Sequence, residues 1–382
     1  MTSTKFPQFL VMLAIVLLVS SCAVPTQVPP TTPPTATTLP TAAPTPTQTA
    51  EAKLVSQIDD YLTALVEQER FMGSILVARE GKVLISKGYG MANLELDVPN
   101  TPQTKFRLAS VTKQFTAMAI LQLQQQGKLN VQDPICKYIR DCPEAWQPIT
   151  IHHLLTHTSG IHDYWDAPDV EDFEKKSVSP IQIIDRFRDL PLDFEPGESL
   201  YYSNSGYALL GYIIEKVSGQ PYAIFLENNI FEPLQMADTG YDNNRMVIKN
   251  RASGYASTAA NAEYIDMSVA YAGGGLYSTV EDLFRWDQAL YTDKLLSKPL
   301  RDEMFTPFVS LVGSELGYGY GWFIGKQFNH QGVAGWGNME GVRTAIDRYP
   351  DDQVTIIVLS NFENTSTGDI TTEIARMIFG EK

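Results

Sequence analysis

A serine and a lysine three positions apart form the first group in this chain that could do chemistry. Ser110 and Lys113 stand at the start of a run of helix formers with apolar residues at 115, 118, 120, 121 and 123. Residues i and i+3 share a helix face, so the two side chains can touch. A serine nucleophile needs a base, and a lysine serves only where burial or a neighbouring cation favours its neutral form. The spacing predicts an acylating serine; a capping serine beside a solvated lysine is the alternative.

A tyrosine and an asparagine form a second group, in a loop that follows a Pro-Gly turn and opens a helical pattern. Tyr202 and Asn204 are two positions apart there. A tyrosine near Lys113 would lose its proton more easily and act as the general base toward Ser110. The asparagine would hold a substrate amide and the lysine by hydrogen bonds. A core tyrosine beside a turn asparagine is the alternative, and residues 241–243 show the same Tyr-x-Asn spacing.

These residues must be positioned by a mixed fold. Apolar alternation and turn signals predict two strands near the start of the folded region and three near its end, with helical patterns between them. This order is typical of an α+β domain: an antiparallel five-stranded sheet with helices on both faces and a largely helical inserted region. The predicted strands are residues 73–79, 83–90, 318–325, 342–348 and 354–360, and the predicted helices include 52–70, 151–155, 206–218, 280–291 and 367–379.

The first 22 residues have the features of an export signal. Lys5 supplies a positive start, residues 9–19 are apolar, and two serines precede Cys22. The apolar run is short for a membrane span, so a signal peptide is favoured over a transmembrane helix. Residues 19–22 (VSSC) resemble a bacterial lipobox, which predicts lipidation of Cys22; an ordinary signal peptide cut nearby is the alternative.

A tether follows the signal. Residues 23–50 carry no charge and consist almost wholly of Pro, Thr, Ala, Val and Gln, a composition that does not fold. Residues 51–382 are the expected hydrolase domain. The sequence therefore predicts a lipid-anchored, extracytoplasmic protein of the bacterial cell envelope, with its oligomeric state left open.

The composition excludes several classes of binding partner. The formal net charge of −15 argues against nucleic acid and against a polybasic membrane surface. Six positions apart and outside the cytosol, Cys136 and Cys142 are predicted to form a disulfide; two buried thiols are the alternative. No zinc-type or H-E-x-x-H pattern is present, so we expect neither metal nor cofactor. That expectation includes the clustered histidines, His152, His153, His157 and His162.

The chain resembles the serine β-lactamase-like hydrolases, which include class C β-lactamases, D,D-peptidases, D-aminopeptidases and family VIII-type esterases. The resemblance covers about residues 52–380, and five blocks in order are far more specific than any one of them. The blocks are residues 106–113 (FRLASVTK), 150–160 (TIHHLLTHTSG), 195–207 (EPGESLYYSNSGY), 273–279 (GGGLYST) and 358–361 (VLSN).

The resemblance implies a mechanism. Ser110 attacks a carbonyl and becomes acylated, Lys113 and Tyr202 move the proton, and Asn204 orients the acyl-side amide. The oxyanion binds two backbone N–H groups, one from Ser110 and one from a strand across the cleft. Water or another acceptor then removes the acyl group, and the clustered histidines keep a structural role.

The family's third motif, usually Lys-Thr-Gly or His-x-Gly on the facing strand, departs from the pattern here. The literal match is His330-Gln331-Gly332, in which His330 would help to bind a substrate carboxylate. Spacing to residues 341–344 favours Gly335-Trp336-Gly337 instead, which lacks a cationic side chain. In that register Gly337 lets the backbone approach the substrate, and the N–H of Asn338 completes the oxyanion hole.

The departure bears on the substrate. Without a cation in this motif, β-lactams and D-Ala-D-Ala peptides lose an electrostatic anchor, whereas esters lose less. Esterases of the family include members with a Trp-containing motif, similar to Trp336. We expect a serine hydrolase that cleaves small esters or peptide/amide substrates, cell-wall peptides and β-lactams among them, through an acyl-enzyme on Ser110. The alternative is a non-catalytic or slowly acylating lipoprotein that binds cell-wall peptides.

Overall fold

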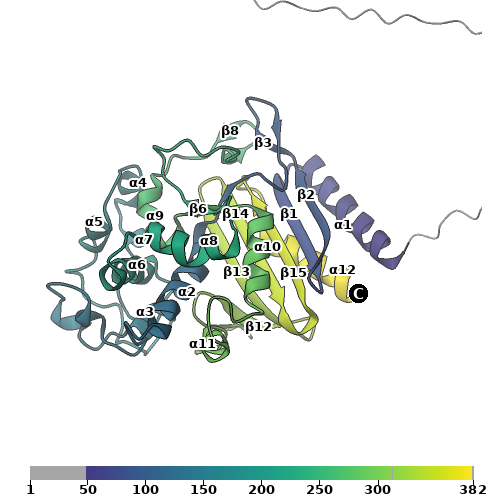
Figure 1. Cartoon of the computed structure of the whole chain (residues 1–382). Coiled ribbons are helices and arrows are strands. Elements are labelled where there is room, and N and C mark those ends of the chain that lie inside the picture. Colours follow the sequence, from purple (N-terminus) through teal and green to yellow (C-terminus); the bar gives the residue numbers. More distant parts are fainter. Residues whose placement is uncertain (1–48, 312, 381–382) are drawn as a thin grey trace, which may run out of the picture. The chain divides into compact units, whose positions relative to one another are not determined.

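The folded region is built on a sheet that joins its two ends. The computed structural model describes residues 49–311 and 313–380, so the predicted signal peptide, Cys22 and nearly all of the predicted tether lie outside the described residues. The strand order is β10-β11-β12-β13-β14-β15-β1-β2. β1 (Gly73–Arg79) lies between β2 (Lys82–Tyr89) and the last strand, β15 (Val354–Ser360), and pairs with both (Figure 1).

The remaining strands of this sheet correct the predicted count of five. They are β10 (Val309–Ser310), β11 (Gly317–Tyr318), β12 (Phe323–Gln327), β13 (His330–Met339) and β14 (Val342–Tyr349). β13 was not found from alternation because its sequence, HQGVAGWGNM, combines three glycines with amide side chains, which are poor strand formers. Only the resemblance placed residues 335–337 on a strand. All pairings are antiparallel, and the α+β class is confirmed.

A turn divides the predicted strand 318–325 into β11 and β12. Gly321 adopts a φ of +82°, and a Cβ there would lie 2.9 Å from the carbonyl oxygen of Lys113. Only glycine fits both the backbone angle and the close approach. The turn therefore lies directly on the backbone that carries the lysine.

Helices cover both faces of the sheet. α1 (Ala50–Glu67) and α12 (Thr367–Phe379) pack on one face, where Ile356 and Val358 of β15 join their apolar side chains. Ile357 and Leu359 alternate to the other face and join the larger core with α10 (Val280–Ala289). This period-two alternation buries β15 on both sides, as expected of a central strand.

The inserted region is largely helical, as predicted, and surrounds α2 (Thr112–Gln125) (Figure 1). Residues 112–123 are all buried, so α2 is enclosed on every side rather than amphipathic. Its neighbours α6 (Asn204–Ser218) and α9 (Met267–Gly274) pack on it and on each other. The other helices are α3 (Ile151–Leu155), α4 (Val170–Phe173), α5 (Pro180–Ile184), α7 (Tyr222–Leu226), α8 (Glu232–Leu234) and α11 (Lys298–Met304).

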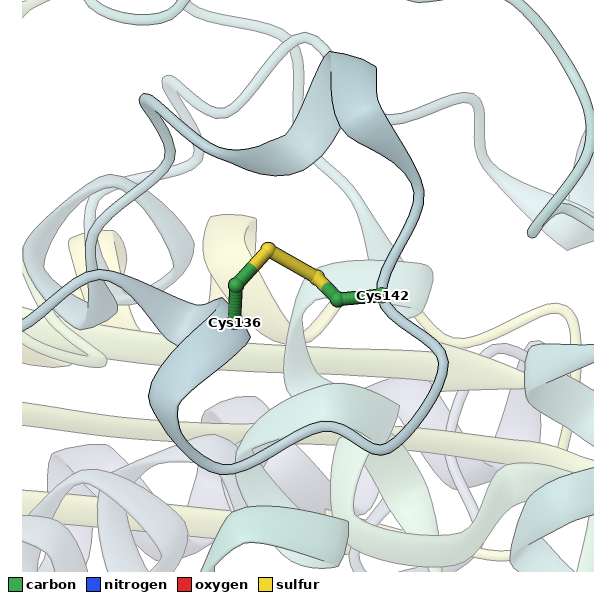
Figure 2. Close-up of a disulfide and its surroundings, with 2 residues drawn as sticks. All are labelled: Cys136 and Cys142. Carbon is green, nitrogen blue, oxygen red and sulfur yellow. A yellow bond between two sulfur atoms is a disulfide. The ribbon is translucent and has the colours of Figure 1, made fainter.

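Cys136 and Cys142 are joined by a disulfide, which closes a short loop after α2 (Figure 2). Across residues 49–311 and 313–380, no helix combines the length and apolar character needed to cross a membrane. The same residues contain no group of three or more His, Cys, Asp or Glu side chains placed to hold a metal ion.

Candidate active site

Ser110 lies in a one-turn 3₁₀ helix, Ala109–Val111, that leads directly into α2. Ala109 has a φ of +46°, an unfavourable angle for a residue with a side chain. Such strain persists where surrounding contacts enforce it, and it is frequent at functional sites. Ser110 itself is only partly buried and lines a cleft of about 1070 Å³, so its hydroxyl is accessible to a ligand.

The amine of Lys113 is fixed by three neighbours. Its Nζ lies 3.0 Å from Oγ of Ser110, and it donates to Oδ1 of Asn204 and to the carbonyl oxygen of Gly273, each at 2.9 Å. The last two partners can only accept, so they take two N–H bonds of the amine. In the neutral amine, the lone pair is then left to face the Ser110 hydroxyl. This is the geometry of a general base beside its nucleophile.

Asp163 fixes the orientation of Asn204. Its Oδ2 accepts both the backbone N–H and the side-chain amide of Asn204, at 2.9 and 3.0 Å. The amide nitrogen is thereby used, so Oδ1 must face Lys113. Asn204 is the first residue of α6, whose cap Ser203 accepts from the N–H of Gly206, and the helix start therefore positions this side chain.

Burial sets the charge state of Lys113. The side chain is 1% exposed, and among the described residues no carboxylate lies within ion-pair distance of it. Burial lowers the pKa of Lys113 to about 7, and the negative charge of Asp163 limits the fall. About half of the molecules would then hold a neutral amine near pH 7, the form that can accept the serine proton.

Tyr202 meets Ser110 from the other side, and its expected charge state is corrected. Its hydroxyl is hydrogen-bonded to Ser110, and Nζ of Lys113 lies 4.7 Å from its ring centre. Proximity to Lys113 was expected to ease loss of the phenolic proton. Burial instead raises the pKa of Tyr202, and Asp163 adds to the rise. Tyr202 is therefore a neutral phenol, suited to giving a proton rather than removing one.

The strand facing Ser110 is the second half of β13. A Cβ at Gly337 would lie 2.3 Å from the carbonyl oxygen of Leu108, so only glycine permits this approach. β12 pairs with β13 no further than Ala334, opposite Phe323, which leaves residues 335–339 without a strand neighbour on that edge. Gly337 and Asn338 line the cleft beside Ser110, so the register Gly335-Trp336-Gly337 holds in this structure.

His330 is placed elsewhere, which corrects its assignment as a substrate-binding residue. It begins β13 at the end away from the cleft, where Nδ1 lies 2.8 Å from Asp352 and the ring stacks on Phe379 at 3.8 Å. A strand rises about 3.3 Å per residue, so the seven positions to Gly337 separate it widely from Ser110. The match of His330-Gln331-Gly332 to the family motif was misleading. The register of β13 against β12 and β14 decides which part of the strand faces the cleft, and that part is residues 335–339.

The cleft has an aromatic wall and a polar end. Tyr318, Phe323 and Trp336 form the wall, and Phe323 stacks on Trp336 at 4.7 Å. At the polar end, the cationic Arg343 of β14 holds the carbonyl oxygens of Met339 and Val342 through Nη1, both at 2.8 Å. Among the described residues Arg343 has no ion-pair partner, so a cation does border the cleft, although not in the third motif.

Sequence reasoning missed three contributors to the site: Asp163, His157 and the carbonyl of Gly273. Each reaches Lys113 or its partners only through tertiary packing, so no spacing rule indicates them. Two of the three lie in blocks that resemble the family, His157 in residues 150–160 and Gly273 in residues 273–279, whereas Asp163 lies outside both blocks. His157, one of the clustered histidines expected to be structural, is buried beside the cleft with its ring 4.3 Å from the Tyr202 ring.

Comparison with known proteins gives a consistent result. Residues 58–377 match the family model described as Beta-lactamase. A penicillin-binding protein of Bacillus subtilis is 35% identical over 329 residues, which cover 78% of this chain and 70% of the relative. The octameric penicillin-binding protein homologue from Pyrococcus abyssi is 29% identical, with a TM-score of 0.78 over 86% of this chain and 78% of that one. The D-amino acid amidase of Ochrobactrum anthropi SV3, 24% identical with a TM-score of 0.76, shares the fold over 86% of this chain and all of its own (100%).

Proposed function

This chain belongs to the β-lactamase family of serine hydrolases, and we propose that it cleaves small esters or peptide-like amides through an acyl-enzyme on Ser110. One observation carries the proposal. The buried amine of Lys113 has two acceptors for its N–H bonds and lies 3.0 Å from the Ser110 hydroxyl. A lysine of lowered pKa in that position has the geometry and the protonation state that a general base needs.

Each group has one role in the proposed acylation step. Neutral Lys113 takes the proton of Ser110 as Oγ bonds to the carbonyl carbon. The oxyanion is held by the N–H groups of Ser110 and Asn338. Tyr202 gives its phenolic proton to the leaving group and recovers one from Lys113. Water then attacks the acyl-enzyme, the same groups run in reverse, and Ser110 is released with the acid.

The charged side chains of the cleft indicate whether the substrate carries a carboxylate. Gly335 leaves the third motif without a cation, which favours a neutral ester or amide. Arg343 is the observation that favours a second candidate, a substrate carrying a carboxylate, such as a cell-wall peptide or a β-lactam. A matched pair of esters with and without a carboxylate separates the two, because Arg343→Gln lowers kcat/KM only for a substrate that uses the guanidinium.

For the cellular location we propose a lipid anchor on Cys22 and an extracytoplasmic catalytic domain. The apolar run followed by VSSC supports this proposal. Replacement of Cys22 by alanine is expected to move the protein from the membrane fraction to the soluble one. An unchanged distribution would remove the anchor from the proposal and leave the hydrolase untouched.

Intact-mass measurement tests the function. The purified protein is mixed briefly with an activated ester, a penicillin and a D-Ala-D-Ala peptide, and product release is followed in parallel. A transient adduct with continuing product is expected for one of them, and Ser110→Ala should show neither while its thermal unfolding midpoint stays within a few degrees. An unchanged mass with all three and no product would leave the non-catalytic peptide-binding lipoprotein in its place.

A further inference from the structure

His157 has an unusual backbone for its residue type. It follows α3 with a φ of +60°, the left-handed position where helices usually end in glycine or asparagine. A histidine there costs free energy that a glycine would not. The side chain is nevertheless 1% exposed and packed among the site residues. The contacts that hold this conformation are made with the residues on either side of Tyr202.

Three contacts join His157 to the segment that carries Tyr202. The carbonyl oxygen of His157 accepts from the N–H of Tyr201 at 3.0 Å, and its Nδ1 accepts from the N–H of Ser203, also at 3.0 Å. Its ring lies 4.3 Å from the Tyr202 ring, with 31° between the planes. His157 thus holds the backbone on either side of Tyr202 and supports the phenol itself.

These contacts also fix the tautomer of the imidazole. Because Nδ1 accepts from Ser203, the ring proton of the neutral form must sit on Nε2. Among the described residues Nε2 is buried without a hydrogen-bond partner, which is a costly state for a donor. Packing alone would be served better by an apolar ring without the unpaired Nε2–H donor. The histidine is instead required for its Nδ1, which accepts from the N–H of Ser203.

We propose that His157 is a positioning residue for acylation, which holds the Tyr202 hydroxyl at Ser110 by clamping residues 201–203. The inference rests on the proposed function, because it assigns His157 to that same reaction. The charged and titratable groups that face the imidazole are Lys113 from α2, Tyr202 and Tyr207 from the α6 segment, and Tyr318 from β11. Burial and the Lys113 charge lower the pKa of His157, which favours the neutral ring whose Nδ1 accepts from Ser203.

Two variants separate the parts of the clamp. His157→Phe keeps an aromatic ring and removes the Nδ1 acceptor. His157→Asn keeps an acceptor near the Nδ1 position, tolerates the positive φ and removes the ring. We expect His157→Phe to lower the acylation rate by about 10²-fold with KM little changed, because a displacement of about 1 Å costs this much. His157→Asn should retain more of the rate, within about tenfold of wild type.

The pH profile distinguishes positioning from folding. In His157→Phe the freed loop admits water to Lys113, so the acidic limb of the acylation profile should move to higher pH; in His157→Asn it should not. His162→Asn is the matched control, since His162 is partly exposed and bonded to Asp193 outside the cleft. The proposal would be overturned if His157→Phe kept the wild-type acylation rate per folded molecule and the wild-type position of the acidic limb. This holds even if its thermal unfolding midpoint fell.

Nitrogen-15 NMR of labelled histidine in the wild-type protein gives a readout independent of activity. The expected result is an Nε2–H tautomer for His157 that does not titrate between about pH 5 and 8. A titrating ring or an Nδ1–H tautomer would overturn the proposed clamp. If His157→Phe does not fold, this NMR measurement on the wild-type protein still tests the proposal. Failure of wild type to form any adduct would instead contradict the proposed function, so the two failures are distinguishable.

Discussion

Two buried cations, Arg348 and Lys113, have opposite kinds of partner. Arg348 of β14 is 1% exposed and forms an ion pair with Asp287 of α10, which is fully buried. Thr355 donates to the same carboxylate at 2.8 Å. Lys113 is equally buried, but its partners are a serine, an amide and a carbonyl. The arginine site holds its charge with a counter-charge, and the lysine site does not.

The difference separates a structural cation from a reactive one. An arginine keeps its proton in any protein environment, and a carboxylate compensates the buried charge of Arg348. A buried amine without a carboxylate gives up its proton readily, and this is the state that a base requires. Asp163 bonds to Asn204 rather than to Lys113, and its negative charge raises the pKa of Lys113 without offsetting the effect of burial. The pKa of Lys113 is therefore lowered to about 7.

The largest expected effect comes from removing the unpaired cation. Lys113→Met keeps an apolar chain of similar length and removes the base, so acylation of Ser110 should fall by at least about 10³-fold. Rapid-mixing mass spectrometry with an activated ester measures it. Lys113→Arg is the control, since it keeps a charge that does not titrate and should be equally inactive. Wild-type labelling in either variant would assign the base elsewhere.

Breaking the paired cation should affect stability instead. Asp287→Ala leaves Arg348 buried without its counter-charge, at an expected cost of about 3–5 kcal/mol in the free energy of unfolding. Urea unfolding measures the cost. Acylation per folded molecule should stay at the wild-type level. The double variant with Arg348→Met removes both charges and should be more stable than Asp287→Ala alone; a cost as large as that of the single variant would show that the pairing is not what stabilises this region.

The two sites should also differ in their response to pH. Acylation should rise about tenfold per unit below pH 7 and level off above it, as Lys113 becomes neutral. The ordinary lysine pKa is 10.5 and the folded value is about 7. Between these values the unfolded chain binds more protons, so the free energy of unfolding increases with pH. Unfolding at pH 7 and pH 9 should show this increase in wild type, and equal slopes in Lys113→Met would contradict it.

The smallest effect is expected at a second pair, His330 and Asp352, which extends the comparison to a partly exposed site. Their side chains are 32% and 26% exposed. Such pairs contribute about 0–1 kcal/mol. His330→Ala should therefore leave ester turnover within about twofold and lower stability slightly. Steady-state kinetics with the activated ester measures the turnover. A large fall in kcat/KM would show that His330 takes part in substrate binding after all.

Local spacing found the four residues that the structure brings together. Ser110 and Lys113 share one turn of chain, so local geometry brings them together. Tyr202 and Asn204 are neighbours in sequence at the start of α6, and tertiary contacts place each of them at the site. The charge state of Tyr202 was predicted wrongly, because burial outweighs a neighbouring cation and burial is not visible in a motif. Asp163 and His157 lie some forty positions from their partners, and only packing joins them.

The sheet shows the same limit. Its strands with regular β-branched alternation were predicted, with ends that differ by a few residues. β13 was not, because the close approach to Ser110 demands glycines, and these erase the strand pattern. The predicted domain boundary at residue 51 and the segments before it stay predictions. The part of a fold that serves chemistry is thus the part whose sequence is least typical of its secondary structure.

The order of strands has a consequence for how the protein reaches its active state. β13 is held by β14, β14 by β15, and β15 by β1, whose residues pair from Gly73 opposite Ser360 to Arg79 opposite Val354. β15 is synthesised long after β1 and β2, so the first hairpin waits for most of the described residues before its partner exists. Contacts of such long range slow folding. Activity is therefore expected only after β15 has joined β1, and a chain that ends before β15 would carry every proposed reactive group without the strand that holds β14 to β1.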